Sequence, residues 1–514
     1  MMNRKSKFVM LQGTSSSAGK STLTAGFLRY FSDRGISCSP FKPQNMSLNS
    51  FVTEDGFEIA VSQVVQSEAA FKKPIRQINP ILIKPASDLK MHLIVEGKYY
   101  GNMNFKKYNG GKDFFLKKAM ESFEFLTSEN ELVVLEGAGS PAEINLFKYD
   151  IANMGFAGVY DIPVILAADI ERGGVFASIY GTVKLIPPKW RKLIKGFIIN
   201  KFRGDASILE PGIKCMERRL KIPCLGVLPY IENLHIEAED SLDLKSAGSF
   251  GKGKNEGRLK IGIVRLDHIS NFNEFDSLFF DDRIAVRFFD CVPSDADEFD
   301  MIIIPGSKST VSDLSSIKRS KIFDYIKKIG RRGVIMGICG GFQMMGERIE
   351  DPIGIESGIS MTEGFGFFKT VTVLSEEKIL LNRKYRFNNP ESSLSGYEIH
   401  NGRTFFAEDY SSGDAYTDLF KSETVKKCRG NILPENGILS KDGKKIGTYV
   451  HGLFGNMAFK NFIVGIAGKH KKLDHNGGRF KDYNAVKDES FNLLSKNIEK
   501  YVDIKTLRDN IIAI

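Results

Sequence analysis

A glycine-rich segment near the N-terminus has the composition of a phosphate-binding loop. Gly13 and Gly19 enclose Thr14 and four other small residues, and Lys20-Ser21 follows directly. Glycines let successive backbone N–H groups point into one concavity, to which a following helix adds its positive dipole end. Lys20 would contact phosphate oxygens, and the Ser21 hydroxyl would bind Mg²⁺. The glycines are one residue further apart than in the common G-x-x-x-x-G-K-S form, and the segment predicts an ATP site.

Carboxylates at two places could complete a magnesium site with Ser21, because Mg²⁺ prefers oxygen ligands. Glu136 directly follows the apolar run Leu132–Leu135, at a strand end where parallel sheets bind ligands. Asp55 is the other candidate, and its place before a glycine equally suits a turn residue. Asn200 follows another apolar run and could contact the nucleotide. The sequence thus predicts Ser21, Asp55 and Glu136 as metal ligands.

A second reactive segment lies in the C-terminal half. Cys339 is the centre of the pattern Gly-Ile-Cys-Gly-Gly, which follows one apolar run and precedes another. This is the cysteine form of the tight strand-to-helix turn that exposes a nucleophile. The N–H of Gly340 could donate to an oxyanion, and a second donor could come from the turn at Gly306. The pattern predicts a nucleophilic Cys339 with an oxyanion hole at Gly306 and Gly340.

A cysteine nucleophile needs a base, and two of the seven histidines are suitably placed. His451 follows the strand-like run Lys445–Val450 and precedes a glycine. His400 also follows a short apolar stretch and is the rival. Position along the chain slightly favours His451.

The elements around these residues predict an α/β protein. Near-continuous apolar runs are typical of parallel strands that are covered on both faces. They alternate with amphipathic stretches, of which 22–33 is the first predicted helix. The predicted strands lie at 8–11, 132–135, 163–166, 196–199, 259–264, 301–304 and 333–336. We therefore expect two doubly wound domains, the first with a parallel sheet of the P-loop NTPase kind.

A polar segment rich in Gly, Ser and Lys predicts the domain boundary. We expect a first domain at residues 1–245, a linker at 246–258 and a second domain at 259–514. An amphipathic stretch around Ser490–Val502 predicts a surface helix that closes the second domain.

Composition limits the class of protein. The chain has 514 residues, 42% hydrophobic and 26% charged, with a formal net charge of +10. No run approaches the ~18 apolar residues that cross a bilayer. Lys and Arg are spread along the chain without a nucleic-acid-binding motif, so we expect neither nucleic acid nor a membrane as partner. Six cysteines without a C-x-x-C pair, and an N-terminal apolar run too short for a signal peptide, predict a cytoplasmic protein.

Together the two candidate sites resemble those of the cobyric acid synthases, a family of glutamine-dependent amidases of the cobalamin pathway. The first half is similar to dethiobiotin-synthetase-like P-loop proteins, which share the lengthened Gly13–Lys20 spacing. The second half is similar to class I glutamine amidotransferase domains. The most discriminating match is the segment Phe41-Lys-Pro-Gln-Asn-Met-Ser-Leu-Asn-Ser50. The resemblance runs from about Lys7 to about Gly455 and also includes Asp169–Phe176, Asn200–Gly204, Pro305–Thr310 and Gly396–His400.

The resemblance implies ATP- and glutamine-dependent amidation of adenosylcobyrinic acid a,c-diamide at its b, d, e and g carboxylates. Cys339 would release ammonia from L-glutamine, with His451 transferring the protons. ATP and Mg²⁺ at the phosphate loop would activate a carboxylate of the corrinoid substrate as an acyl phosphate.

One position departs from the wider amidotransferase superfamily. Most of those enzymes have His-x-Glu, whereas His451-Gly-Leu453 puts leucine where the acid would be. The cobyric acid synthases are similar in lacking that Glu. The site would then be a Cys–His dyad, with His451 oriented by some other group.

Three rival functions share part of this pattern. Cobyrinic acid a,c-diamide synthase has the same two chemistries, but it carries a different segment in place of Lys42–Met46. CTP synthetase also joins a synthase to an amidotransferase domain, but its His-x-Glu is absent here. A partition-type nucleotide switch would carry an extra lysine early in the loop and would leave Cys339 unexplained.

Overall fold

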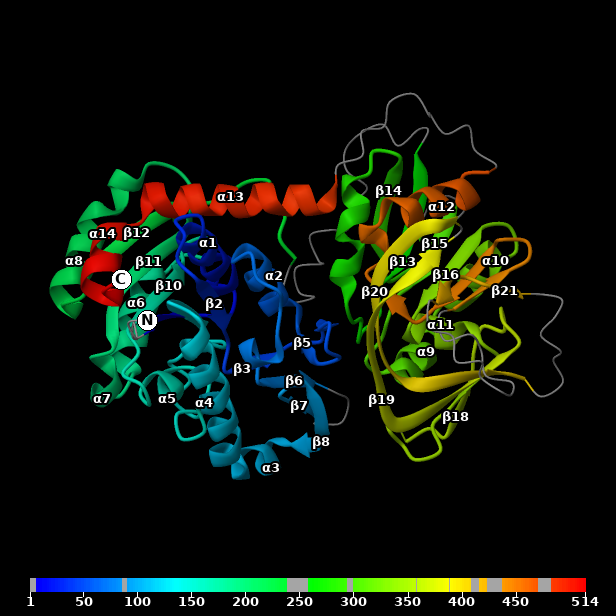
Figure 1. The fold of residues 1–514 in the computed structure, drawn as a ribbon, viewed down its shortest axis with the longest axis horizontal. Helices are drawn as coiled ribbons and strands as arrows, with labels where there is room; N and C mark the ends of the chain where they lie inside the picture. The colour runs from blue at the N-terminus through cyan, green and yellow to red at the C-terminus, as the bar shows by residue number, and fades with distance from the viewer. Residues whose placement is uncertain are drawn as a thin grey trace.

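The structure is a computed structural model that describes residues 6–85, 90–237, 258–293, 299–356, 358–387, 389–407, 416–422, 437–469 and 482–514. Figure 1 shows two α/β bodies side by side, the first blue to green and the second green to orange. The predicted α/β class with two domains is confirmed. The predicted linker lies outside the described residues, except for Arg258.

A six-stranded sheet forms the centre of the first domain, and every strand pair in it is parallel. Its strands in spatial order are β12 (Cys224–Pro229), β11 (Ile194–Phe202), β10 (Val164–Asp169), β1 (Lys7–Gly13), β9 (Leu132–Glu136) and β2 (Cys38–Phe41). Four of them contain the predicted apolar runs. The order reverses beside β1, and ligands bind at the carboxyl end of such a reversal.

Alternate residues of these strands face two separate cores, which is why the runs are apolar throughout. Val9 and Leu11 belong to one core, and Met10 belongs to the other. Helices α1 (Lys20–Ser32) and α2 (Val61–Ala69) cover the first face, and α4 (Lys112–Glu129), α5 (Met154–Ala157) and α6 (Val175–Leu185) cover the second. The domain also contains α3 (Phe105–Gly110), α7 (Pro188–Arg191), α8 (Glu210–Leu220), η1 (Arg76–Ile78) and η2 (Ala206–Leu209).

Two small sheets extend the first domain toward the second, and the sequence analysis did not predict them. One has the order β3 (Gln44–Met46), β6 (Ile81–Pro85), β7 (Lys90–Val95), β8 (Lys98–Asn104), and the other pairs β4 (Ser50–Val52) with β5 (Glu58–Ala60). The segment Phe41–Ser50 thus runs from the end of β2 through β3 to β4. It leads from the central sheet to the domain contact.

The second domain contains a seven-stranded sheet in which the pairs are parallel except for the two antiparallel pairs at one edge. Its order is β14 (Ile284–Phe289), β13 (Leu259–Val264), β15 (Met301–Ile304), β16 (Val334–Ile338), β24 (Lys445–Thr448), β23 (Ile438–Ser440), β21 (Tyr416–Asp418). The helical segments of this domain are η4 (Phe272–Phe280), α9 (Thr310–Lys318), α10 (Ile322–Gly330), α11 (Gly340–Met345), η5 (Leu453–Gly455) and α12 (Met457–Ala467).

A second sheet of this domain is dominated by a long antiparallel hairpin of β19 (Thr370–Phe387) and β20 (Asn389–Phe406). The other members are β18 (Met361–Glu363), β17 (Arg348–Glu350), β22 (Lys421–Ser422) and β25 (Val450–His451). The hairpin lies on the side of this domain that faces the first domain (Figure 1).

The C-terminal helix corrects the sequence prediction. α13 (Tyr483–Tyr501) does not close the second domain but lies along α1 of the first, as the red helix in Figure 1 shows. Phe491, Leu494 and Ile498 enter the core that α1 shares, and Arg29 of α1 pairs with Asp488. The chain continues through α14 (Ile504–Thr506) and the π-helix η6 (Leu507–Ile512). The prediction failed because an amphipathic helix pattern does not specify which apolar surface covers it.

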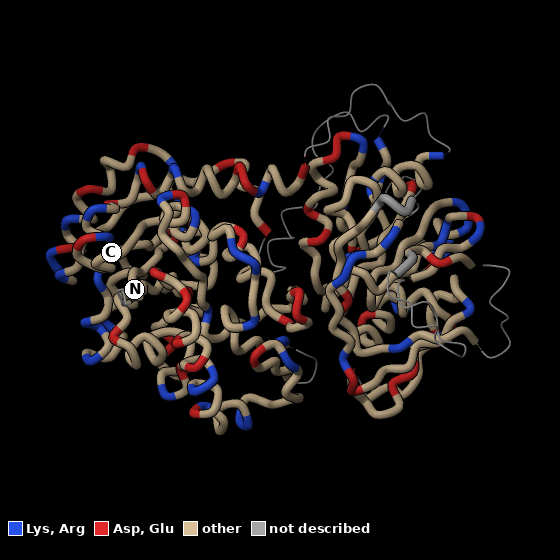
Figure 2. The backbone as a smooth tube through the Cα atoms, viewed as in Figure 1, with Lys and Arg blue, Asp and Glu red and all other residues tan. Residues whose placement is uncertain are grey.

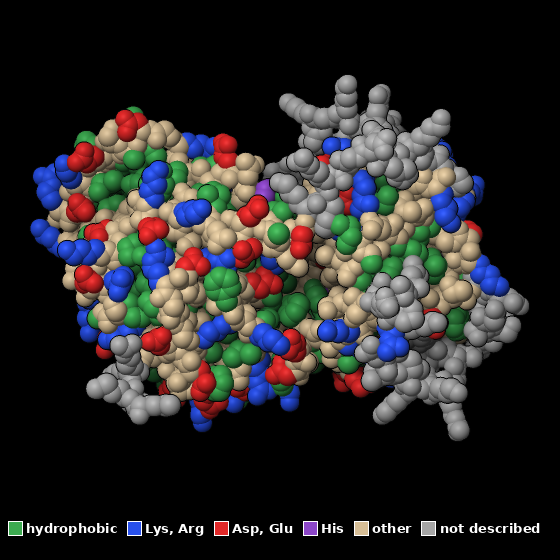
Figure 3. All heavy atoms as spheres, turned by 45° about the horizontal axis from the view of Figure 1, so that its top comes forward, with side chains coloured by type: hydrophobic (Ala, Val, Ile, Leu, Met, Phe, Trp, Pro, Cys, Tyr) green, Lys and Arg blue, Asp and Glu red, His purple; other side chains and the backbone are tan. Residues whose placement is uncertain are grey.

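The two domains meet through β4, β5 and the hairpin. The Asn382 amide donates to the Val52 carbonyl at 2.6 Å, and the rings of Phe51 and Tyr397 lie 4.9 Å apart. Basic and acidic residues alternate along the backbone of both domains (Figure 2), and their side chains are interspersed over the face that Figure 3 shows. No described helix is both long and apolar enough to cross a membrane.

Candidate active sites

The loop after β1 has the strand–loop–helix geometry that the sequence predicts. Gly19 is left-handed, at φ 87°, and α1 begins at Lys20. A Cβ on Gly19 would lie 2.2 Å from the Asn200 side-chain nitrogen, so only glycine fits there. Asn200 donates to the Ala18 carbonyl at 3.1 Å, which places this predicted nucleotide contact against the loop itself.

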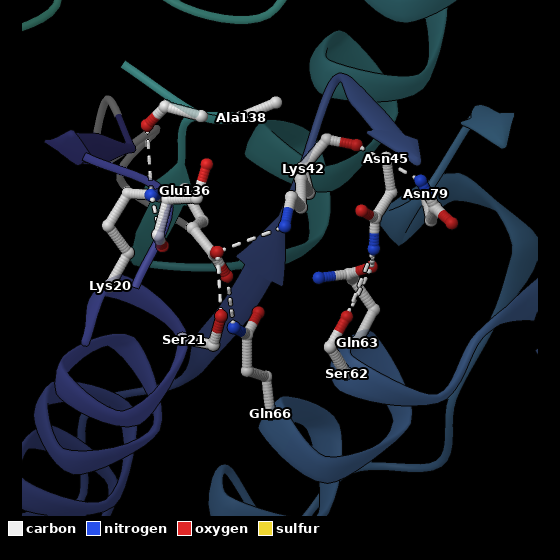
Figure 4. A network of polar contacts seen from close by, with 12 residues as sticks. Lys20, Ser21, Lys42, Asn45, Ser62, Gln63, Gln66, Asn79, Glu136 and Ala138 are labelled. Atoms are coloured by element: carbon white, nitrogen blue, oxygen red, sulfur yellow. Dashed lines mark hydrogen bonds and ion pairs between the residues drawn. The ribbon is translucent and has the colours of Figure 1, made fainter. Parts of the chain in front are cut away.

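Lys20 points into the loop. Its ammonium donates to the carbonyls of Ser15, Ser16 and Gly139 at 3.1, 3.1 and 2.9 Å, and the residue is 3% exposed (the loop region is drawn in Figure 4). These carbonyls keep the buried cation paired. Phosphate oxygens could replace them as partners of the same ammonium. The geometry fits a nucleotide phosphate, with Gly13 and Thr14 at the start of the loop.

Glu136 at the end of β9 is the centre of a polar cluster (Figure 4). It is fully buried and accepts from the Ser21 hydroxyl at 2.8 Å, from Lys42 at 3.0 Å and from Gln66 at 2.6 Å. The Ser21 hydroxyl at the start of α1 and the Glu136 carboxylate at the end of β9 are oxygen ligands of the kind that Mg²⁺ prefers. They fit the ion that accompanies ATP.

The structure does not bring Asp55 to this cluster. Asp55 is exposed in the turn between β4 and β5, where its carboxylate accepts from the Thr53 hydroxyl at 2.5 Å. Asp55 thus has the turn position that the sequence also allowed, and its predicted metal role has no support from a contact with Ser21 or Glu136. The sequence did not reveal that Asp55 lies apart from this cluster, because the separation arises from β4, which leads away from the central sheet toward the second domain.

The phosphate loop opens into a cavity of about 840 Å³, called here the phosphate-loop cavity. This volume lies in the upper part of the range of small-molecule sites. Its walls come from the loop and Lys20, from the segment 42–49, from α3 and from residues 138–153. Phe272 of the second domain also lines it.

Cys339 lies at the end of β16, where α11 begins. Its backbone is at φ 51° and ψ −111°, a conformation that is strained for a residue with a side chain. A Cβ on Gly341 would lie 1.9 Å from the Ile304 carbonyl oxygen, so the turn requires glycine there. This is the predicted nucleophile turn, held between β15 and β16.

Cys339 and His451 line one narrow pocket, called here the thiol pocket. It is lined by Lys84, Ser270, Asn271, Ser307, Lys308, Thr310, Cys339, Gly340, Gln343, Glu356, Lys378, Ile399, His400, Asn401 and His451. Lys84 comes from β6 of the first domain, so both domains form this pocket. Lys84 and Lys378 both pair with the buried Glu58 of β5, which ties the pocket wall to the domain contact.

His451 is fully buried beside a carboxylate that the sequence analysis did not single out. Its Nδ1 lies 3.1 Å from Oε1 of Glu274, and its ring stacks on Tyr397 with centroids 5.4 Å apart. Burial disfavours the charged ring, but Glu274 and the neighbouring Cys339 outweigh it and raise the pKa of His451 to about 10. The His451 imidazolium is therefore the favoured form of this ring at neutral pH.

The rival His400 lines the same pocket but is held differently. Its Nδ1 lies 2.7 Å from the Gly402 carbonyl, and its ring stacks on Tyr449 with centroids 3.7 Å apart. Cys339 is one of the groups that raise the pKa of His451. This geometry favours His451 as the base.

The two predicted oxyanion segments lie against each other. A Cβ on Gly340 would come 2.9 Å from the Ser307 backbone nitrogen, and one on Gly306 would come 3.4 Å from Cε1 of His451. The Gly306 carbonyl accepts from the Ser270 N–H at 2.9 Å, which fixes this turn. Gly306 and Gly340 are thus together beside Cys339 and His451.

Comparison with known proteins agrees with this arrangement. The CobQ/CobB/MinD/ParA nucleotide binding domain matches residues 9–244, and the CobB/CobQ-like glutamine amidotransferase domain matches residues 260–459. A solved structure of the signal recognition particle receptor FtsY from Elizabethkingia anophelis covers 46% of this chain and 64% of its own at 14% identity. Its TM-score of 0.27 is too low to add to the argument.

Full-length relatives carry the family assignment. A probable cobyric acid synthase of Methanocaldococcus jannaschii is 41% identical over 98% of this chain and 99% of its own. Cobyric acid synthases of Clostridium novyi and Clostridium perfringens are 40% and 42% identical, over 98% and 96% of this chain and 97% and 98% of their own. The chain therefore belongs to the cobyric acid synthase family.

Proposed function

We propose that this protein catalyses the ATP- and glutamine-dependent amidation of the b, d, e and g carboxylates of adenosylcobyrinic acid a,c-diamide. The observation that carries the proposal is the presence of two complementary sites in one chain. A phosphate loop opens into a large cavity, and a cysteine at a strained turn lies in a pocket with a charged histidine. One site suits activation of a carboxylate, and the other suits release of ammonia from an amide.

In the thiol pocket, the Cys339 thiolate attacks the side-chain amide carbon of glutamine. Backbone N–H groups at Gly306 and Gly340 would hold the oxyanion. The His451 imidazolium protonates the departing ammonia, and the neutral ring then takes a proton from the water that hydrolyses the thioester. The raised pKa of His451 favours the first of these steps at neutral pH.

In the phosphate-loop cavity, a carboxylate of the substrate attacks the γ-phosphorus of ATP, and ADP leaves as the acyl phosphate forms. Ammonia then displaces phosphate from the acyl phosphate and forms the amide. Lys20 neutralises phosphate charge, and Ser21 and Glu136 would hold Mg²⁺, whose charge assists the transfer. Positioning and electrostatics account for most of such a reaction.

The segment Phe41–Ser50 supports the corrinoid substrate over that of the rival a,c-diamide synthase. Gln44, Met46 and Leu48 line the phosphate-loop cavity. Asn45, also at the wall, is held by Ser62 and Gln63 at 3.0 Å each (Figure 4). The segment that discriminates between the two families therefore lies where the substrate would bind.

The test is incubation of the purified protein with ATP, Mg²⁺, glutamine and one corrinoid acid at a time. Mass spectrometry counts the amides formed. We expect four new amides on the a,c-diamide and none at the a and c positions of the unamidated acid. Amidation confined to the a and c positions would instead assign the protein to the rival function.

A further inference from the structure

Glu274 lies where a catalytic histidine usually finds its acid partner, although it is far from His451 in the chain. It belongs to η4, and its side chain is 3% exposed. One carboxylate oxygen is 3.1 Å from Nδ1 of His451, and the other accepts from the Gly452 N–H at 3.3 Å. Both oxygens thus contact the His451 segment, so the carboxylate constrains the imidazole and its backbone together.

The position that carries the acid in His-x-Glu enzymes is occupied here by a leucine that packs in the core. Leu453 is 1% exposed and belongs to the apolar core of the second domain. A carboxylate cannot reach His451 from that side without displacing this packing. Glu274 approaches Nδ1 from η4 instead.

The other buried carboxylate close to a histidine of the pocket is engaged elsewhere. Glu398 lies 3.5 Å from Nε2 of His400, but it accepts from the Tyr385 hydroxyl at 2.6 Å and from Arg383 at 3.4 Å. Its charge is already compensated within the hairpin. Among the described residues, Glu274 is therefore the acid that bears on His451.

A carboxylate at Nδ1 determines the behaviour of the opposite ring nitrogen. It fixes the proton on Nδ1 and stabilises the imidazolium, so that Nε2 is the nitrogen that exchanges a proton. Nε2 of His451 is buried and has no hydrogen-bond partner of standard geometry among the described residues. His451 lies in the thiol pocket with Cys339, which is one of the groups that raise the pKa of this ring.

We propose that Glu274 is the positioning residue of the glutaminase site, replacing from η4 the acid that is missing two residues after His451. The proposal rests on the glutaminase half of the proposed function. The site is then a Cys339–His451–Glu274 triad. Its acid lies 177 residues before His451 in the chain.

The test compares Glu274→Gln and Glu274→Asp with the wild type in ammonia release from glutamine across pH. The amide cannot stabilise the imidazolium, so we expect kcat to fall by about 10²-fold or more with little change in KM. The alkaline limb of kcat should also move to lower pH, because Glu274 raises the pKa of His451. Glu274→Asp keeps the charge and should restore part of kcat and most of the limb.

Glu398→Gln is the matched control, since it removes another buried carboxylate beside a histidine of the same pocket. It should leave the alkaline limb where it is. Ammonium-supported amidation reports whether each variant is folded. A Glu274→Gln protein with wild-type kcat and an unmoved limb would overturn the proposal, as would an equal shift in Glu398→Gln.

If Glu274→Gln does not fold, the Asp variant decides. An alkaline limb of kcat near that of the wild type, together with a reduced kcat, supports a positioning role for Glu274. An unchanged kcat in Glu274→Asp contradicts that role. The absence of ammonia release from the wild type would refute the proposed function itself, which is a separate outcome.

Discussion

The thiol pocket and the phosphate-loop cavity differ in how far their reactive groups are arranged in advance. In the thiol pocket, His451 already contacts Glu274 at 3.1 Å, and the strained Cys339 is locked by neighbouring glycines. In the phosphate-loop cavity, the Lys20 ammonium is held by three backbone carbonyls, which phosphate oxygens could replace. The first site is organised before substrate arrives, and the second is completed by its substrates.

The chemistry explains this difference. Covalent catalysis on a small amide requires two side chains at fixed positions, and a narrow buried pocket provides them. A substrate with several carboxylates must place each of them in turn at the γ-phosphorus of a newly bound ATP, which requires room. The cavity of about 840 Å³ provides that room. One protein therefore combines a rigid site for nitrogen release with a spacious site for nitrogen use.

The largest expected effect comes from removing the nucleophile. Cys339→Ala should reduce glutamine-supported amidation to background, a loss on the order of 10⁶-fold for the nucleophile of a triad. Amidation with ammonium salts should persist, since the phosphate-loop cavity is untouched. The measurement is amide formation with each nitrogen source. Loss of both activities in a folded variant would mean that the two sites are not separable.

The phosphate loop gives the converse result. Lys20→Ala should lower amidation from either nitrogen source by about 10²–10³-fold, because one cationic donor to the transferring phosphoryl group is lost. Glutamine hydrolysis measured without ATP should be retained. Full ATP turnover in this variant would remove the loop from the mechanism.

A smaller effect is expected at the contact that joins the two sites. Asn271 lines the thiol pocket, and its neighbour in the chain, Phe272, lines the phosphate-loop cavity. The Asn271 side chain accepts from the Ser50 N–H of the first domain at 2.8 Å. Asn271→Gly preserves the left-handed backbone at φ 54° and removes this contact. One buried hydrogen bond contributes ~0.5–1.5 kcal/mol, so glutamine consumed per amide formed should rise by about two- to ten-fold.

The control for this variant is Asn233→Gly, which makes the same substitution at φ 55° on an exposed residue. Its ratio of glutamine consumed to amide formed should equal that of the wild type. A wild-type ratio in Asn271→Gly as well would show that this contact does not couple the sites.

The smallest effect separates the two predicted metal carboxylates. Asp55→Asn should leave amidation unchanged and alter the free energy of unfolding by less than about 0.5 kcal/mol, as expected for an exposed turn residue. Glu136→Gln should instead raise the Mg²⁺ concentration needed for half-maximal amidation. Equal Mg²⁺ dependence in the two variants would contradict the assignment of Glu136.

Local sequence determined the two reactive turns. The glycines around Lys20 and Cys339 permit backbone conformations that few other residues adopt, so a short segment specifies both the turn and the residue that it presents. The near-continuous apolar runs likewise predicted the parallel strands β1, β9, β10, β11, β13, β15 and β16, because burial on both faces leaves no alternation. These features depend on neighbours within a few residues.

Only the tertiary structure decided the contacts between distant segments. It placed Glu274 beside His451, moved α13 onto α1, brought Lys84 of the first domain into the thiol pocket and left Asp55 in an exposed turn. A carboxylate or an amphipathic helix is compatible with many partners, and its local sequence does not determine which of them it contacts. The partner follows from how the whole chain closes its cores, which is why the residues of each turn could be identified from sequence and their supporting charges could not.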